Sequence, residues 1–449
     1  MATILRPELL DQIFGFLEFD LVSLKNCALA SLSLYHEAER HLYKHIELLP
    51  TTRRGKGIAF CVTQSQLLQL LVAKPHMTNC IQSIYMEITP EDLFIPIQSD
   101  DDYADVKTSP TPPLPSLCSL TICSFKPEHC PDWSEVKRDW TCVEKSFRIF
   151  WEGLMYLPSI EEVTIRDVYG FPLAILDYCQ NLKRLNLFNL LLSTTSLPLR
   201  APPSQEHLSP LLQVRYLSLS DNEDGLSVLL EWLTESTALT ATKCSLLRTL
   251  EFQPQSLGCF NSILEFMNTC RLGLMSSFRT SYTPFDSPSG EWSNFYPSPP
   301  LEMEFPSLPN LHKLSIFADI LYDTTQGPNG VHRRYVSSLP AIGEILRRFH
   351  NTAVANALKT IDIHLTVLTD AWDSPVLADI DFAPLASVLS QNSASLTVVL
   401  VLHPLENKPG TPYHTILMAT LISEVASHKD LRGLLTAGHV LIKSSEHYQ

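Results

Sequence analysis

Apolar and polar residues alternate with helical spacing along residues 1–50, and this pattern predicts three short helices. Pro7 suits the opening turn of the first helix, where its missing N–H costs nothing. Asp20 can cap the free N–H groups at the start of a second helix. The apolar positions recur at spacings of three and four: Leu9, Leu10, Ile13, Phe14 and Leu17; Leu21, Leu24 and Ala28; Leu34, Ala38 and Leu42. A unit this small cannot bury so much apolar surface by itself, so we expect it to dock on another surface.

Behind residue 50 a second apolar pattern recurs: apolar, two residues, apolar, two residues, apolar, one residue, apolar. Its last two apolar positions alternate with polar ones, as in a strand with one buried face. The copies are Leu114, Leu117, Leu120 and Ile122; Leu157, Ile160, Val163 and Ile165; Cys179, Leu182, Leu185 and Leu187; Leu211, Val214, Leu217 and Leu219; Cys244, Leu247, Leu250 and Phe252; Leu308, Leu311, Leu314 and Ile316; Ala355, Leu358, Ile361 and Ile363. Weaker versions are Ile81, Ile84 and Met86, and Leu396, Val399 and Val401. One unit cannot bury its own apolar face, so each strand must stack on its neighbours.

Helical patterns lie between these strands, at 63–72, 133–154, 226–233, 342–349, 379–389 and 415–425. The alternation predicts an α/β fold, a solenoid with a roughly parallel sheet on one side. The pattern resembles the leucine-rich repeats in an irregular form, because the spacing is uneven and the usual asparagine after the strand is missing from nearly every copy. We expect a helical unit over 1–50 and a solenoid over 51–449, with Pro- and Ser-rich insertions near 99–115, 192–209 and 282–306.

Composition and charge narrow the function classes. Apolar residues make up 45% and charged residues 18% of the 449 residues, as in a folded soluble protein. The net charge of −15 argues against nucleic acid as the main partner. No apolar run is long enough to cross a membrane, and the start shows no secretory signal. The 11 cysteines are an odd, scattered set that suits reduced thiols, so we expect a cytoplasmic or nuclear protein.

The N-terminal segment resembles the F-box family. The family opens with a leucine, a proline, a glutamate and two leucines, and continues with an isoleucine, an Asp-Leu pair, a cysteine and a serine. The matching residues are Leu5, Pro7, Glu8, Leu9, Leu10, Ile13, Leu17, Asp20, Leu21, Leu24, Cys27 and Ser31. One departure is that Arg6 follows the first leucine, where the family has its proline, and the proline is displaced to Pro7.

The resemblance implies a substrate-recognition subunit of an SCF (Skp–cullin–F-box) ubiquitin ligase. The N-terminal helices would bind a Skp-type adaptor, the adaptor would link the chain to the cullin-based ligase, and the solenoid would capture an unknown target protein. The adaptor-binding residues implied are Leu5, Pro7, Leu9, Leu10, Ile13, Leu17, Leu21, Leu24 and Cys27. Two alternatives stay open: the helices are a structural cap on a hydrolase or metalloenzyme, or the chain is a scaffold outside ubiquitin ligases.

Two clusters could in principle hold a metal. Glu37, His41 and His45 are spaced at four, but the helix is predicted to end near Leu42, and a solvated polar face is the preferred interpretation. The second cluster lacks paired Cys-x-x-Cys motifs and contains Cys118, Cys123, His129, Cys130 and Cys142. We therefore predict no metal and no cofactor.

Catalytic and target-binding residues are not assigned from the sequence. No nucleophile elbow, phosphate loop or dinucleotide motif occurs, so we expect no enzyme activity in this chain itself. Arginines clustered on successive strands would indicate a site for a phosphorylated target. Basic residues do lie near strands, and we interpret them as solvated; they are Arg166, Lys183, Arg184, Arg215 and Arg248.

Overall fold

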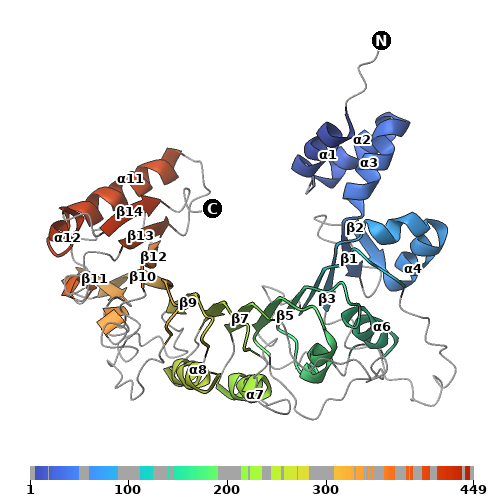
Figure 1. The fold of residues 1–449 in the computed structure, drawn as a ribbon. Coiled ribbons are helices and arrows are strands. Elements are labelled where there is room, and N and C mark those ends of the chain that lie inside the picture. Colours follow the sequence, from blue (N-terminus) through green and yellow to red (C-terminus); the bar gives the residue numbers. More distant parts are fainter. Residues whose placement is uncertain are drawn as a thin grey trace. The chain divides into compact units, whose positions relative to one another are not determined.

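A computed structural model of the chain is shown in Figure 1. It describes residues 6–18, 20–49, 60–88, 112–124, 140, 143, 145–190, 214–220, 223–234, 244–253, 257–270, 272–282, 308–327, 330–337, 339, 342–343, 346–347, 358–369, 381–383, 385–387, 397–404, 412–436 and 440–444. The chain divides into two compact units, residues 1–214 with 231–243 and residues 215–230 with 244–449. Each unit is described by itself.

The first unit opens with three packed helices, as the sequence predicts. They are α1 (Pro7–Phe16), α2 (Leu21–Ala30) and α3 (Leu32–Leu42). Asp20 caps α2, its carboxylate accepting a hydrogen bond from the Ser23 N–H at 3.0 Å. The hydroxyl of Ser31 accepts from the Leu34 N–H at 3.2 Å and starts α3 in the same way. The chain then enters a strand directly, which confirms the predicted end of the third helix near Leu42.

The strands of the first unit are parallel and follow the order β2-β1-β3-β4-β5-β6. They are β1 (His45–Leu49), β2 (Phe60–Thr63), β3 (Ser83–Ile88), β4 (Ser119–Ser124), β5 (Glu162–Arg166) and β6 (Arg184–Phe188). The connections contain α4 (Gln64–Ala73), η1 (Pro75–Asn79), α6 (Lys145–Met155) and η5 (Leu173–Tyr178). Thr63 and Gln66 form a reciprocal capping box at the start of α4, which fixes where that helix begins.

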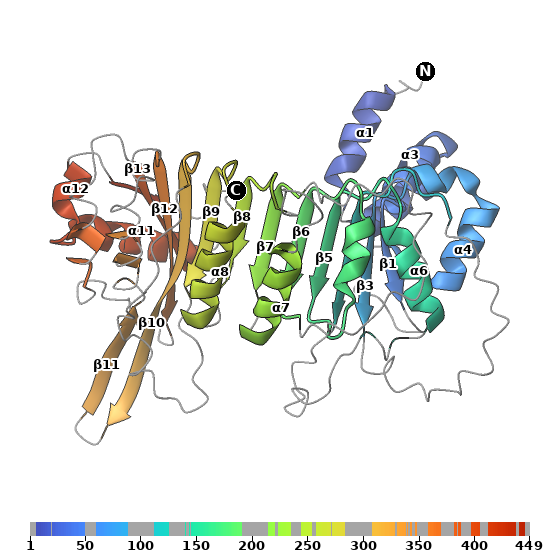
Figure 2. The ribbon, with the colours of Figure 1, turned by 60° about the horizontal axis from the view of Figure 1, so that its bottom comes forward.

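The second unit repeats this plan with one antiparallel addition. Its strands are β7 (Tyr216–Ser220), β8 (Thr249–Phe252), β9 (Ser277–Tyr282), β10 (Lys313–Gly327), β11 (Gly330–Ser337), β12 (Thr360–Thr369), β13 (Thr397–Pro404) and β14 (Val440–Ser444). The order β7-β8-β9-β10-β12-β13-β14 is parallel, and β11 pairs with β10 antiparallel. Its helices are α7 (Glu223–Thr234, whose last residues belong to the first unit), α8 (Leu257–Cys270), α11 (Pro412–Ser427) and α12 (Arg432–Thr436). Figures 1 and 2 show α8 on one face of β8 and β9.

The strand register explains the apolar pattern. Leu120, Val163 and Leu185 are aligned on three neighbouring strands, and all three side chains are fully buried. Leucines of the preceding turns, such as Leu182, are buried as well and bring the chain into the strand. The predicted α/β, leucine-rich-repeat-like arrangement, with packed N-terminal helices followed by parallel strands, is therefore confirmed.

Turns after two neighbouring strands use residues that tolerate a left-handed backbone. Asp167, after β5, has a φ of 56°, and Asn189, after β6, has a φ of 52°. Both residue types adopt this conformation more readily than most others. The Asn189 amide donates to the Asp167 carboxylate at 3.0 Å, so the two turns are linked side chain to side chain.

Some expectations differ from the structure or fall outside its described part. The leucine pattern does not predict β9, because Thr280 occupies the last buried position of its repeat, and it does not predict the antiparallel β11. The helix expected over 133–154 is described only from Lys145. The insertions near 99–115, 192–209 and 282–306 lie almost wholly outside the described residues, as does Leu5. None of the helices in the described part of the chain is long and apolar enough to cross a membrane.

Candidate protein-docking surface on the N-terminal helices

The three N-terminal helices share a small core in which α3 packs against both α1 and α2. Phe14, Leu24, Ala38 and Leu42 form its buried centre. Apolar residues from all three helices pack around this centre and are partly buried; they are Leu10, Leu17, Leu21, Cys27, Ala28, Leu34 and Tyr43. The bundle thus uses one side of each helix for its own folding.

Large apolar side chains remain exposed on the other sides of the helices. In α1, Leu9 is 47% exposed, Ile13 45% and Phe16 91%. These three residues are separated by four and three positions, so they form one stripe along the helix. Val22 and Leu29, seven positions apart in α2, are also exposed, and so is Leu32 at the start of α3. We call Leu9, Ile13, Phe16, Val22, Leu29 and Leu32 the exposed apolar set. Solvated leucine and phenylalanine side chains of this size are typical of a surface that another protein covers.

The structure divides the predicted adaptor-binding residues into two groups. Leu9 and Ile13 are exposed, whereas Leu24 is fully buried in the core that the three helices share. Leu10, Leu17, Leu21 and Cys27 are core residues with partly exposed side chains. The backbone of Pro7 opens α1, and Leu5 lies outside the described residues.

Sequence reasoning missed Phe16, Val22, Leu29 and Leu32. It grouped Leu9, Leu10, Ile13, Phe14 and Leu17 into one wide stripe, whereas in the structure Phe14 is buried and Leu9 and Ile13 are exposed. Helical phase separates the missed residues from Phe14 and Leu24, but the burial of these two residues, which sets that phase, is known only from the structure.

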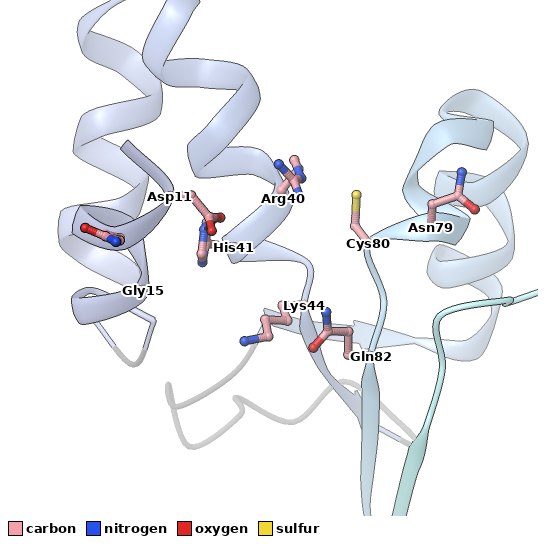
Figure 3. A pocket seen from close by; sticks show the side chains of 9 residues that line it. Asp11, Gly15, Arg40, His41, Lys44, Asn79, Cys80 and Gln82 are labelled. Atoms are coloured by element: carbon pink, nitrogen blue, oxygen red, sulfur yellow. Dashed lines mark hydrogen bonds and ion pairs between the residues drawn. The ribbon is translucent and has the colours of Figure 1, made fainter. Parts of the chain in front are cut away.

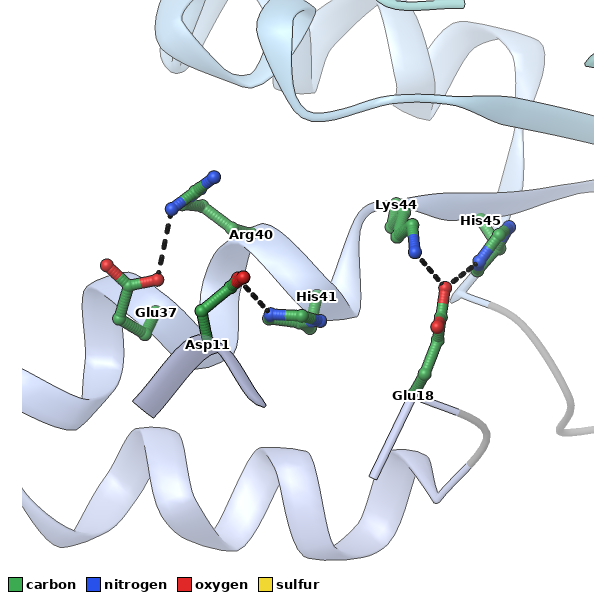
Figure 4. A network of polar contacts seen from close by, with 7 residues as sticks. All are labelled: Asp11, Glu18, Glu37, Arg40, His41, Lys44 and His45. Carbon is green, nitrogen blue, oxygen red and sulfur yellow. Dashed lines mark hydrogen bonds and ion pairs between the residues drawn. The ribbon is translucent and has the colours of Figure 1, made fainter. Parts of the chain in front are cut away.

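Polar contacts fix α1 against α3 and the start of the sheet (Figure 4). The Nε2 atom of His41 lies 3.1 Å from Oδ1 of Asp11, and the His41 side chain is only 10% exposed. Glu18, just after α1, contacts Lys44 and lies 2.5 Å from Nε2 of His45. Partial burial opposes ionisation of Glu18, but hydrogen bonds from Lys44 and His45 outweigh it and lower the pKa of this carboxyl below its ordinary value.

These contacts also separate the three residues that the sequence suggested as a possible metal site, Glu37, His41 and His45. Glu37 pairs with Arg40 at 3.1 Å, His41 with Asp11, and His45 with Glu18. Their partners lie on different elements, so the three side chains are not brought together. The interpretation of a solvated face was wrong for His41, because α1 covers it.

A buried carboxylate holds α3 to the end of α4. Glu39 is 5% exposed and accepts hydrogen bonds from the Tyr35 hydroxyl at 2.7 Å and from the Lys74 ammonium. Burial raises the pKa of Glu39, but the hydrogen bonds from Lys74, Tyr35 and His76 outweigh it, and the net pKa is lowered. The hydrogen bond to Glu39 in turn raises the pKa of Lys74, so each group favours the charged form of the other.

A polar pocket of about 430 Å³ lies between α1, α3 and the turn from η1 to β3 (Figure 3). Its lining mixes both charges with amides: Asp11, Gln12, Gly15, Arg40, His41, Lys44, Asn79, Cys80 and Gln82. The one thiol in this lining, Cys80, is partly buried, and burial raises its pKa. The raised pKa disfavours the thiolate, which is the nucleophilic form of cysteine.

The second cysteine cluster is described only in part. Cys118 donates to the Gln82 carbonyl, and Cys123 lies 2.8 Å from the Tyr85 hydroxyl. His129, Cys130 and Cys142 lie outside the described residues. Within the described ranges, no group of three or more His, Cys, Asp and Glu side chains could hold a metal ion.

Comparison with protein-family models and with curated proteins gives no match for this chain.

Proposed function

We propose that this chain is a substrate-recognition subunit of an SCF-type ubiquitin ligase. The observation that carries the proposal is the exposed apolar set on α1, α2 and α3, in the segment whose sequence resembles an F-box. The helices would bind a Skp-type adaptor, and the strand-rich remainder would bind a target protein. In this role the chain makes and breaks no bond itself, and it acts in the cytoplasm or nucleus, where such ligases work.

The contact residues follow from exposure. Leu9, Ile13 and Phe16 on α1 offer the longest stripe, and Val22, Leu29 and Leu32 extend the set to the other two helices. Covering one large apolar side chain completely contributes roughly 1.5–3 kcal/mol. In the proposed complex these exposed side chains supply apolar contact area, whereas Leu24 and Phe14 keep the helices packed.

The direct test is affinity purification from cells followed by mass spectrometry. The informative variant is Phe16→Asp, because Phe16 is 91% exposed and its replacement leaves the helix core intact. The matched control is Val72→Asp on α4, an apolar residue that is 82% exposed and lies outside the exposed apolar set. We expect a Skp-type adaptor and a cullin to co-purify with the wild type and with Val72→Asp, and to be lost with Phe16→Asp.

Other outcomes would separate the alternatives. Retention of adaptor and cullin by Phe16→Asp would contradict the assigned surface. Recovery of an adaptor without any cullin would favour a scaffold outside ubiquitin ligases. Absence of both from the wild type would overturn the proposal.

A further inference from the structure

A row of basic residues lies along one edge of the second unit, where successive parallel strands begin. In each repeat, two residues that are not buried separate a buried residue of the turn from the first buried residue of the strand. In the repeat of β8, for example, Arg248 and Thr249 lie between the buried Leu247 and Leu250. The equivalent pairs before and in β7, β8, β9, β10 and β12 are Arg215 and Tyr216, Arg248 and Thr249, Ser276 and Ser277, His312 and Lys313, and Lys359 and Thr360. None of these residues is acidic. The strands that carry them can be followed in Figure 2.

Backbone hydrogen bonds place the first member of each pair in one line. The N–H of Arg248 donates to the Arg215 carbonyl at 2.9 Å, and the N–H of Ser276 donates to the Arg248 carbonyl at 2.8 Å. The line continues through His312, whose N–H donates to Ser276 at 3.1 Å, and Lys359, whose N–H donates to His312 at 3.0 Å. The side chains of Arg215, Arg248, His312 and Lys359 are exposed. We call these four residues the basic edge.

The first unit has the same backbone pattern but neutralises its charges. There Lys183 pairs with Glu161 at 2.5 Å, and Arg184 lies 3.7 Å from Glu162 on the neighbouring repeat. On the basic edge, by contrast, no ion pair of its four side chains occurs within the described residues. Arg215 and Arg248 occupy equivalent positions on neighbouring repeats, and like charges in such positions destabilise a sheet. Within the described part of the chain, no ion pair offsets this repulsion.

Two acidic side chains, three residues beyond Arg248 and Lys359 on their strands, have partners other than these basic residues. Glu251 accepts from the Tyr216 hydroxyl and lies 3.6 Å from Arg279. Asp362 is buried and pairs with Lys313 at 2.8 Å. Among the described residues, these two acidic side chains therefore do not neutralise the basic edge.

Two exposed leucines accompany the basic edge. Leu246 precedes Arg248 by two residues and is 40% exposed, and Leu274 precedes Ser276 by two residues and is 49% exposed. Neighbouring strands are about 4.8 Å apart, so the four steps from β7 to β12 span roughly 19 Å, the length of about six extended residues. An extended peptide with anionic and apolar side chains matches both properties.

We propose that the basic edge binds an extended anionic segment of a partner protein, with carboxylate or phosphate groups opposite Arg215, Arg248 and Lys359 and apolar side chains against Leu246 and Leu274. That this partner is the target for ubiquitylation rests on the proposed function; the binding itself does not. A peptide fits better than a nucleic acid, because a chain with a net charge of −15 repels a long polyanion and the leucines would have no counterpart in a phosphate backbone.

The test uses the full chain and an array of synthetic peptides of about ten residues, long enough to cross the basic edge. Each peptide is made in three forms that carry aspartate, phosphoserine or serine at the same positions between apolar residues. We expect the chain to retain anionic forms about tenfold more strongly than serine forms. The ratio between aspartate and phosphoserine forms distinguishes an acidic from a phosphorylated partner.

The variant is Arg215→Glu with Arg248→Glu, and the matched control reverses two exposed lysines elsewhere, Lys145→Glu with Lys429→Glu. We expect the first variant to lose the anionic preference and the control to keep it, with equal thermal unfolding temperatures. The proposal is overturned if anionic forms are not preferred, if the first variant keeps the preference, or if single-stranded DNA of equal charge binds as well as the peptides. Adaptor binding is measured on the same variants: a chain that binds anionic peptides and no adaptor contradicts only the proposed function.

Discussion

Phe14 and Phe16 lie two residues apart in α1 and have opposite environments, with 1% of the first side chain exposed and 91% of the second. The helix turns by about 100° per residue, so the two rings leave it on opposite sides. Phe14 closes the core with Leu24 and Leu42, while Phe16 is left for solvent or for a partner. Core packing and solvent exposure thus fall to different residues of the same ten-residue helix.

This division predicts different effects of truncation. Phe14→Ala should destabilise the N-terminal helices by about 3–5 kcal/mol, because it leaves a cavity in a small core. Phe16→Ala should change their stability by no more than about 0.5 kcal/mol. Amide hydrogen exchange of α1–α3 measures both effects. Equal protection losses in the two variants would show that Phe16 also belongs to the core.

The ion pair between Glu39 and Lys74 predicts a second effect. Glu39→Gln leaves Lys74 without its anionic partner and should destabilise the contact between α3 and α4 by about 1–3 kcal/mol. Lys25→Met, on the exposed side of α2, removes a charge without breaking a buried contact and serves as the control. Urea denaturation, followed by far-UV circular dichroism, measures the free energy of unfolding of each variant. A Glu39→Gln protein as stable as the control would show that the pair contributes nothing.

The pH dependence follows from Glu18, whose pKa is lowered in the folded chain. A lowered folded-state pKa stabilises the fold above the ordinary value of 4.5, and this contribution is lost as the pH falls through the lower folded-state pKa. We expect exchange protection of the α1 amides to fall below pH 4.5 more steeply in the wild type than in Glu18→Gln. Identical acid profiles would remove Glu18 as the acid-sensitive link.

The cap at Asp20 gives a prediction with an internal control. Asp20→Ala removes the acceptor for the Ser23 N–H and should cost α2 about 1 kcal/mol. Asp20→Asn keeps an acceptor oxygen and should restore most of that loss. Thermal unfolding of the two variants measures the difference. If Asn and Ala behave alike, the cap does not stabilise α2.

Local sequence signals predicted much of the fold. The leucine pattern located strands such as β5 and β12 because each repeat places the same apolar positions in the core. The start of α2 followed from Asp20, and the change from α3 to β1 followed from the alternation after Leu42. The antiparallel β11 was missed because its pairing with β10 depends on neighbours in space, which a repeat pattern does not report.

The candidate site was predictable only in part. The sequence identified the segment and its surplus of apolar residues, but it did not decide which of them face the core. Leu24 and Val22 have similar side chains, and only the packing of α2 on α3 buries the first and exposes the second. The basic edge was likewise hidden, because Arg215 and Arg248 become neighbours only through the strand register.

The most direct test of the account is the affinity of the purified chain for a purified Skp-type adaptor, measured by calorimetric titration. We predict specific binding by the wild type, binding of equal strength by Val72→Asp, and binding about 10- to 100-fold weaker by Phe16→Asp, since a charge replaces a ring that the adaptor would bury. No heat of binding with the wild type, or equal affinity of all three proteins, would contradict the assignment of the exposed apolar set as an adaptor-binding surface.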